Sequence, residues 1–88
     1  MSYLKEIGIE QDLNSMSIEE ILLKIREFNQ YSIYTVNKYY CIQLFDLEVC
    51  GNDEIDCISE FSDTVLRKVL IRALEDISET IYNRNHDF

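Results

Sequence analysis

The spacing of apolar residues changes twice along this chain, and that change limits the possible folds more than any other feature. Residues 17–29 and 66–81 carry apolar side chains three or four positions apart, the spacing of one face of a helix. Residues 31–49 between them are rich in tyrosine, isoleucine, valine and phenylalanine, which favour strands. The chain therefore predicts a helix, then strands, then a second helix.

Polar residues set the expected limits of the two helices. Ser17 and Glu20 form the S-x-x-E pattern of a capping box, so the first helix is expected from Ser17 to about Asn29. The second helix is expected to start near Ser59 or Ser62. Its apolar face comprises Leu66, Val69, Leu70, Ala73, Leu74, Ile77 and Ile81.

The pair Asn37-Lys38 divides the strand-forming stretch and suits a two-residue hairpin turn, because asparagine tolerates a positive φ. If Val36 pairs with Tyr39, the side chains alternate between two faces. One face, expected to be core, carries Tyr31, Ile33, Thr35, Tyr40, Ile42 and Leu44. The other, rich in tyrosine, carries Ser32, Tyr34, Val36, Tyr39, Cys41 and Gln43.

The predicted fold class is a small α+β helix–antiparallel sheet–helix (α-β-β-α) sandwich of two or three strands, with residues 55–58 as the brief third strand. The alternative places both helices on one face of the sheet and leaves Tyr34 and Tyr39 uncovered. A two-stranded ribbon is only marginally stable alone, so either a third strand joins it or two chains share a sheet or a face. We therefore expect a homodimer.

A length of 88 residues suits one domain. Residues 1–16 are expected as an N-terminal arm or short helix, residues 17–83 as a single α+β domain and residues 84–88 as a frayed tail.

The acidic composition narrows the classes of partner. Seventeen acidic residues against eight basic ones give a net charge of −9. Phosphate backbones and anionic lipids would be repelled, so direct contact with nucleic acid or with a membrane is disfavoured. The chain has no run of 18 apolar residues and no signal-peptide pattern at its start, so we expect a cytoplasmic protein.

Metal, cofactor and catalytic sites find little support in the sequence. The chain has an odd number of cysteines, and they lack the close spacing of a zinc knuckle: Cys41, Cys50 and Cys57. The single histidine, His86, lies close to the end of the chain. We expect reduced thiols, no metal and no cofactor. Glycine-rich phosphate loops and the H-E-x-x-H and C-x-x-C motifs are missing, so we expect no enzyme.

Acidic residues cluster where basic ones are missing. Residues 39–66 contain no lysine or arginine but hold seven acids: Asp46, Glu48, Asp53, Glu54, Asp56, Glu60 and Asp63. Such residues can keep a loop soluble, suit the start of a helix or protect a strand from pairing. They can also form a negative patch that steers a basic partner. A calcium loop lacks the glycine and the alternating spacing of an EF-hand.

Tyrosines on the hairpin are the second candidate feature. They can stabilise the ribbon through cross-strand pairs, or form the centre of an interface if their face is open. A base-stacking platform would need basic neighbours, and only Lys38 is close. The predicted partner-binding set is Asp46, Glu48, Asp53, Glu54, Asp56, Glu60, Tyr34 and Tyr39.

Two stretches resemble known families. The helix, ribbon and helix, with the run Val69-Leu70-Ile71-Arg72-Ala73-Leu74, resemble the small phage "ABA sandwich" proteins over residues 17–78. That resemblance implies an accessory protein of a phage or mobile element, with no assigned activity. Residues 39–47 are similar to HicB-type antitoxins, although the Gly-Asp-Thr helix start of that family is missing here. Neither family supplies functional residues.

These observations lead to one main functional hypothesis and two alternatives. The first is a small acidic module, borne by a phage or mobile element, that binds and blocks a basic host protein in the manner of an anti-defence inhibitor or a toxin-neutralising partner. One alternative is a dimer that binds or sequesters a signalling nucleotide, which would need Arg67, Lys68 or Arg72 at a groove. The other is a purely structural oligomer.

Overall fold

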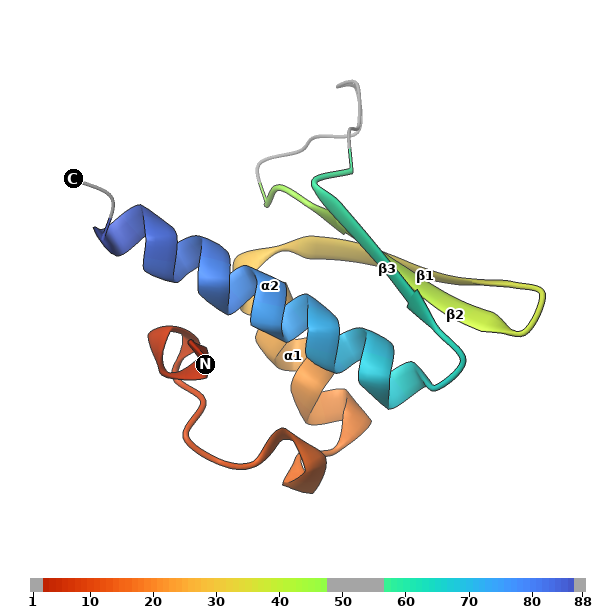
Figure 1. Cartoon of the computed structure of the whole chain (residues 1–88), viewed down its shortest axis with the longest axis horizontal. Coiled ribbons are helices and arrows are strands. Elements are labelled where there is room, and N and C mark those ends of the chain that lie inside the picture. Colours follow the sequence, from red (N-terminus) through yellow and green to blue (C-terminus); the bar gives the residue numbers. More distant parts are fainter. Residues whose placement is uncertain (1–2, 48–56, 87–88) are drawn as a thin grey trace.

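The computed structural model describes residues 3–47 and 57–86. It contains two 3-10 helices, two α-helices and three strands (Figure 1). Their bounds are η1 (Leu4–Ile7), η2 (Leu13–Ser15), α1 (Ile18–Phe28), β1 (Gln30–Val36), β2 (Tyr39–Phe45), β3 (Ser59–Asp63) and α2 (Leu66–His86). The predicted small α+β fold, with a helix, antiparallel strands and a helix in that order, is confirmed.

The predicted capping box starts α1. The Ser17 hydroxyl accepts a hydrogen bond from the Glu20 N–H at 3.1 Å, and the Glu20 carboxylate accepts one from the Ser17 N–H at 3.0 Å. The Ser17 N–H, and after it the Ser17 hydroxyl, hold the pKa of the Glu20 carboxyl below its usual value. At the other end, the Asn29 side chain donates to the Phe45 carbonyl at 3.0 Å and so ties the end of α1 to the end of β2.

The hairpin has the predicted register. β1 and β2 pair antiparallel with Val36 opposite Tyr39 and Tyr31 opposite Leu44. Asn37 adopts a φ of 55° in the two-residue turn, a conformation that asparagine tolerates better than most residues.

The third strand lies later in the chain than expected. β3 spans Ser59–Asp63 and pairs with the other side of β2, so Ser59 and Ser62 belong to a strand and not to the start of a helix. Ile55 and Asp56, in the stretch expected to form this strand, lie outside the described residues. The α2 helix begins only at Leu66. Just before it, the Asp63 carboxylate accepts a hydrogen bond from the Val65 N–H at 3.1 Å.

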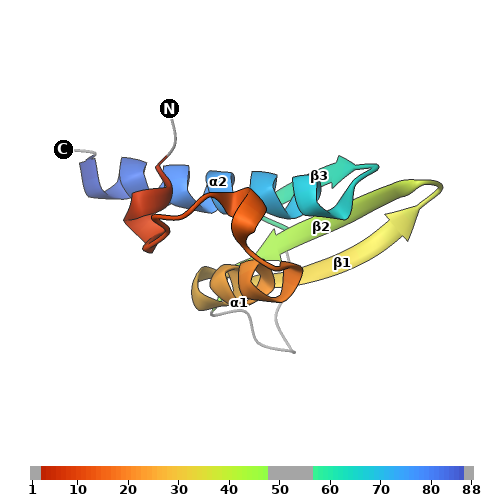
Figure 2. The same ribbon diagram turned by 90° about the horizontal axis from the view of Figure 1, so that it is seen from below.

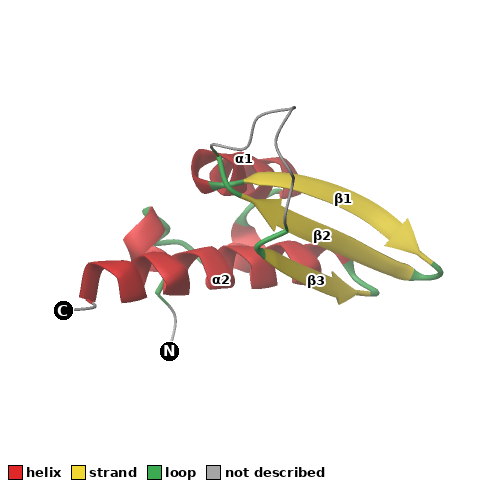
Figure 3. Cartoon of the chain, turned by 90° about the horizontal axis from the view of Figure 1, so that it is seen from above, coloured by secondary structure: helices red, strands yellow, loops and turns green. Residues whose placement is uncertain are grey.

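Both α-helices lie on one face of the sheet. Figure 2 shows α1 and α2 in front of the sheet, and Figure 3, from the opposite side, shows the sheet in front of the helices. The buried core combines Ile42 and Leu44 of β2 with residues of both helices: Ile21, Ile25, Val69, Leu70, Ala73, Leu74 and Ile77. Of the two layer arrangements weighed from the sequence, the one with an uncovered tyrosine face is therefore the one that the structure has.

The hairpin extends past the helices (Figure 1). The face towards the helices was expected to be core along its whole length, and this was wrong at the turn end. Ile33 is 36% exposed and Tyr40 is 38% exposed, and Thr35 is exposed as well. Only Ile42 and Leu44 of this face are fully buried, because they are the residues that meet the helices.

The N-terminal arm packs on the same core. Ile7, Ile9, Leu13 and Met16 are all buried. Arg67 of α2 fastens the arm, because its guanidinium donates to the Met16 carbonyl at 2.6 Å and to the Leu13 carbonyl at 3.3 Å.

The C-terminal helix is longer than expected. It continues to His86, although residues from 84 onwards were expected as a frayed tail. Tyr82 stacks between Tyr3 and His86, with ring centroids 4.2 Å and 4.1 Å away, so aromatic contacts support this last turn.

Candidate protein-binding face

The sheet face turned away from α1 and α2 is the main candidate site, and we call it the open face. No helix of the described chain covers it, as Figure 3 shows. The strand register places on it Ser32, Tyr34, Val36, Tyr39, Cys41, Gln43, Glu60 and Ser62.

One carboxylate joins all three strands at the centre of the open face. The Tyr34 hydroxyl of β1 donates to Glu60 Oε2 of β3 at 2.5 Å. The Gln43 amide of β2 donates to the same oxygen at 2.8 Å. Two donors on neighbouring strands therefore hold the Glu60 side chain across the sheet.

The same hydrogen bonds change the ionisation of the two acidic groups. The carboxylate beside the Tyr34 hydroxyl raises the pKa of Tyr34 to about 12, mainly because the neutral phenol is the form that donates. The pKa of Glu60 is lowered, first by the bond from Tyr34 and then by the bond from Gln43. At neutral pH the open face therefore carries a negative charge in a fixed position.

We expect the Tyr34→Phe substitution to raise the pKa of the Glu60 carboxyl towards its ordinary value, because the larger of its two stabilising bonds is lost. The measurement is the ¹³C chemical shift of the Glu60 carboxyl, followed by NMR from acid to neutral pH. Since the folded-state pKa lies below that of the unfolded chain, the bonds to Glu60 stabilise the fold above the unfolded value, and this contribution is lost as the pH falls through the folded value.

A matched control for this titration is Tyr31→Phe, which removes a hydroxyl from the other face of β1. It should leave the pKa of the Glu60 carboxyl as it is in the unsubstituted chain. An unchanged Glu60 pKa in Tyr34→Phe would contradict the shared hydrogen bonds.

Apolar side chains lie on the same face, at its turn end. Val36 and Tyr39 are opposite one another in the register, and each is 50% exposed. Cys41, in the middle strand, is buried and 7% exposed. Exposed aromatic and aliphatic side chains are enriched at the centre of protein-binding sites, whereas charges lie more often at the rim.

The structure brings together only part of the predicted partner-binding set. Tyr34, Tyr39 and Glu60 share the open face, whereas Asp46 follows the far end of β2. Four other members, Glu48, Asp53, Glu54 and Asp56, lie outside the described residues.

Gln43 is the site residue that the sequence prediction missed. It was placed on the correct face, but its contact with Glu60 depends on the position of the third strand, which was expected earlier in the chain. The sequence carries no apolar alternation that would mark this strand, because Phe61 is the single apolar residue between Ile58 and Val65.

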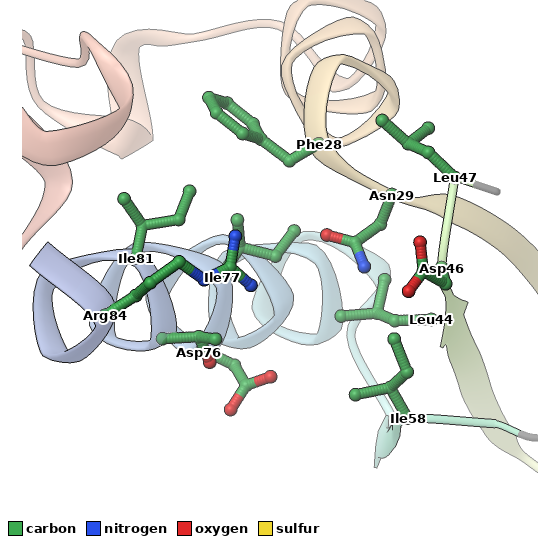
Figure 4. A pocket seen from close by; sticks show the side chains of 11 residues that line it. Phe28, Asn29, Leu44, Asp46, Leu47, Ile58, Asp76, Ile77, Ile81 and Arg84 are labelled. Carbon is green, nitrogen blue, oxygen red and sulfur yellow. The ribbon is translucent and has the colours of Figure 1, made fainter.

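A cleft of about 410 Å³ lies between α2, the end of α1 and the end of β2 (Figure 4). Its polar lining includes Asn29, Asp46, Asp76 and Arg84. An anionic ligand would meet two carboxylates here and one arginine, which is poor charge complementarity.

Two of the three basic residues named for a nucleotide site are engaged elsewhere. Arg67 binds the N-terminal arm, and Arg72 lies over the ring of Phe61 with its guanidinium carbon 5.4 Å from the centroid. Neither residue lines the cleft.

Among the residues described here, no group of three or more histidine, cysteine, aspartate or glutamate side chains is placed to hold a metal ion. In the same part of the chain, no helix has both the length and the apolar character needed to cross a membrane.

Comparison with family models, with curated proteins and with solved structures finds no match to this chain. The resemblances to "ABA sandwich" proteins and to HicB-type antitoxins therefore stay predictions.

Proposed function

We propose that this chain is a small interaction module, borne by a phage or mobile element, that binds a basic protein through the open face and blocks it. The observation that carries this proposal is the uncovered sheet face, which exposed Val36 and Tyr39 share with a hydrogen-bonded, ionised Glu60. An anti-defence inhibitor and a toxin-neutralising partner are the two forms of this role.

The fixed position of Glu60 favours binding to a cation. A free surface glutamate loses side-chain freedom when it forms an ion pair, and this loss offsets most of the gain. Glu60 is already held by Tyr34 and Gln43, so less freedom remains to be lost when an arginine or lysine of a partner approaches it.

The electrostatic surroundings support the same choice of partner. No lysine or arginine side chain projects from the strands onto the open face, and the nearest in sequence is Lys38 in the hairpin turn. In a chain of net charge −9, a basic surface would be attracted over a distance, and association would weaken as salt is added.

The test is affinity capture from a lysate of the host, followed by binding measurements with the captured protein in purified form. We expect a basic partner whose affinity falls at least about tenfold, or about 1.4 kcal/mol, in Tyr39→Ser and in Glu60→Lys. The matched control is Glu79→Lys, which makes the same charge change at an exposed position of α2 and should retain the partner.

Three results would count against the proposed function. The first is that the captured protein binds Tyr39→Ser and Glu60→Lys as tightly as it binds the unsubstituted chain. The second is that the affinity does not change between low and high salt. The third is that native mass spectrometry of gently purified protein shows an adduct of a few hundred daltons, because this would indicate a small-molecule ligand.

A further inference from the structure

The two edges of the sheet differ in how they are protected. β2 is the middle strand, so β1 and β3 both present an edge. β3 has five residues, two of which are the acids Glu60 and Asp63. β1 has seven residues and contains no charge, no proline and no glycine. Short length and charge are the usual means by which proteins prevent edge pairing, and only β3 has them.

The hairpin geometry shows which backbone groups of β1 face outwards. In a two-residue hairpin the residues that flank the turn exchange hydrogen bonds, here Val36 and Tyr39. Inward and outward directions alternate from that pair, so the N–H and C=O groups of Tyr31, Ile33 and Thr35 point away from β2. These six groups form a row along a strand whose turn end extends past the helices (Figure 1).

We propose that β1 pairs with β1 of a second copy of this chain, antiparallel and around a two-fold axis at Ile33, to form one six-stranded sheet. In this register Ile33 lies opposite Ile33 of the partner subunit, and Tyr31 lies opposite Thr35 of the partner subunit. Each pair exchanges two backbone hydrogen bonds.

The distribution of charge favours the β1 edge over the β3 edge as the place where two copies meet. Two copies of net charge −9 repel one another, and pairing through β3 would bring Glu60 and Asp63 of both subunits together. β1 contains no charged residue, so two copies can pair there without like charges facing one another across the two strands. A two-fold axis needs such a self-complementary patch.

Exposed apolar area supports the same register. Ile33 faces the side of the helices but is 36% exposed, and none of the described residues of its own chain covers it fully at the edge. Its own copy across the axis would cover it. The pairing also joins the open faces of the two subunits into one surface, although this inference does not depend on the proposed function.

A single strand pair makes a small interface. It lies below the roughly 1,200 Å² of a standard stable complex, so we expect a dimer of micromolar affinity and not a permanent one. Sedimentation velocity from about 1 to about 500 µM protein should therefore show a shift from monomer to dimer.

Ile33→Lys tests the edge directly. It should raise the dimer dissociation constant at least about tenfold, because it places two ammonium groups side by side at the axis. The substitution also makes each chain less negative. If repulsion between the net charges of the two chains controlled dimerisation, Ile33→Lys would therefore strengthen the dimer. The control is Ser62→Lys, which adds the same charge at an exposed position of β3 and should dimerise like the unsubstituted chain.

Thr35→Pro is a second test that does not depend on how lysine is tolerated at position 33. Proline is accepted in an edge strand where the N–H points outwards, so the fold should survive while intermolecular hydrogen bonds are lost. Circular dichroism checks the fold. The proposal is wrong if the chain stays monomeric at the highest concentration, if Ser62→Lys abolishes the dimer, or if folded Ile33→Lys and Thr35→Pro dimerise normally.

Discussion

Leu74→Ala is expected to lower the free energy of unfolding by about 3 kcal/mol. Leu74 is 0% exposed and belongs to the core that α2 shares with α1, the sheet and the N-terminal arm. The substitution removes buried methyl groups and leaves a cavity that rigid neighbours on several sides cannot fill. A domain of this length has a total stability of about 4–13 kcal/mol, so the loss would be a large share of it.

Urea denaturation followed by circular dichroism measures this loss. The matched control is Leu23→Ala in α1, where the same side chain is 55% exposed. It should change the unfolding free energy by less than about 0.5 kcal/mol. Equal losses in the two variants would contradict the position of the core.

Arg67→Ala is expected to destabilise the protein by about 2 kcal/mol and to loosen the N-terminal arm first. The guanidinium binds two carbonyls of the arm, those of Met16 and Leu13, in a partly buried position. Without it, two backbone acceptors next to buried apolar residues lose a charged donor. Removing one partner of such a bond costs more than the bond itself contributes.

Hydrogen exchange separates this effect from a general loss of stability. The amides of Ile9 and Met16 are hydrogen-bonded within the arm. Arg67→Ala should increase their exchange rates by a larger factor than it increases those of the core amides of α2. Arg67→Lys should recover only part of the stability, because a lysine side chain ends one bond short of the Arg67 Nη1 that donates to both carbonyls. An arm that exchanges at the unsubstituted rate would show that Arg67 does not hold it.

The local features of the fold could be predicted because each depends on neighbouring residues. The capping box of Ser17 and Glu20, the turn at Asn37 and the register of β1 on β2 all depend on short-range rules. The apolar face of α2 follows from its spacing in the same way, and all its predicted members are buried or partly buried.

The features that failed depend on contacts between distant residues. Ser59 and Ser62 look like helix starts, but pairing with β2 makes their stretch a strand. Ile33 and Tyr40 look like core residues, but their burial depends on how far the helices reach along the hairpin. The Glu60 site was only partly predicted for the same reason, since its two donors, Tyr34 and Gln43, lie 26 and 17 residues away in the sequence.

The position of α2 in the chain has a consequence for how the protein is made. This helix contacts η1, α1, β2 and β3, and it is the last of the described elements to leave the ribosome. Before α2 emerges, the apolar faces of the arm, α1 and the hairpin therefore lack the helix that packs against them. Until α2 has emerged, we expect these apolar faces to be open to aggregation and to chaperones.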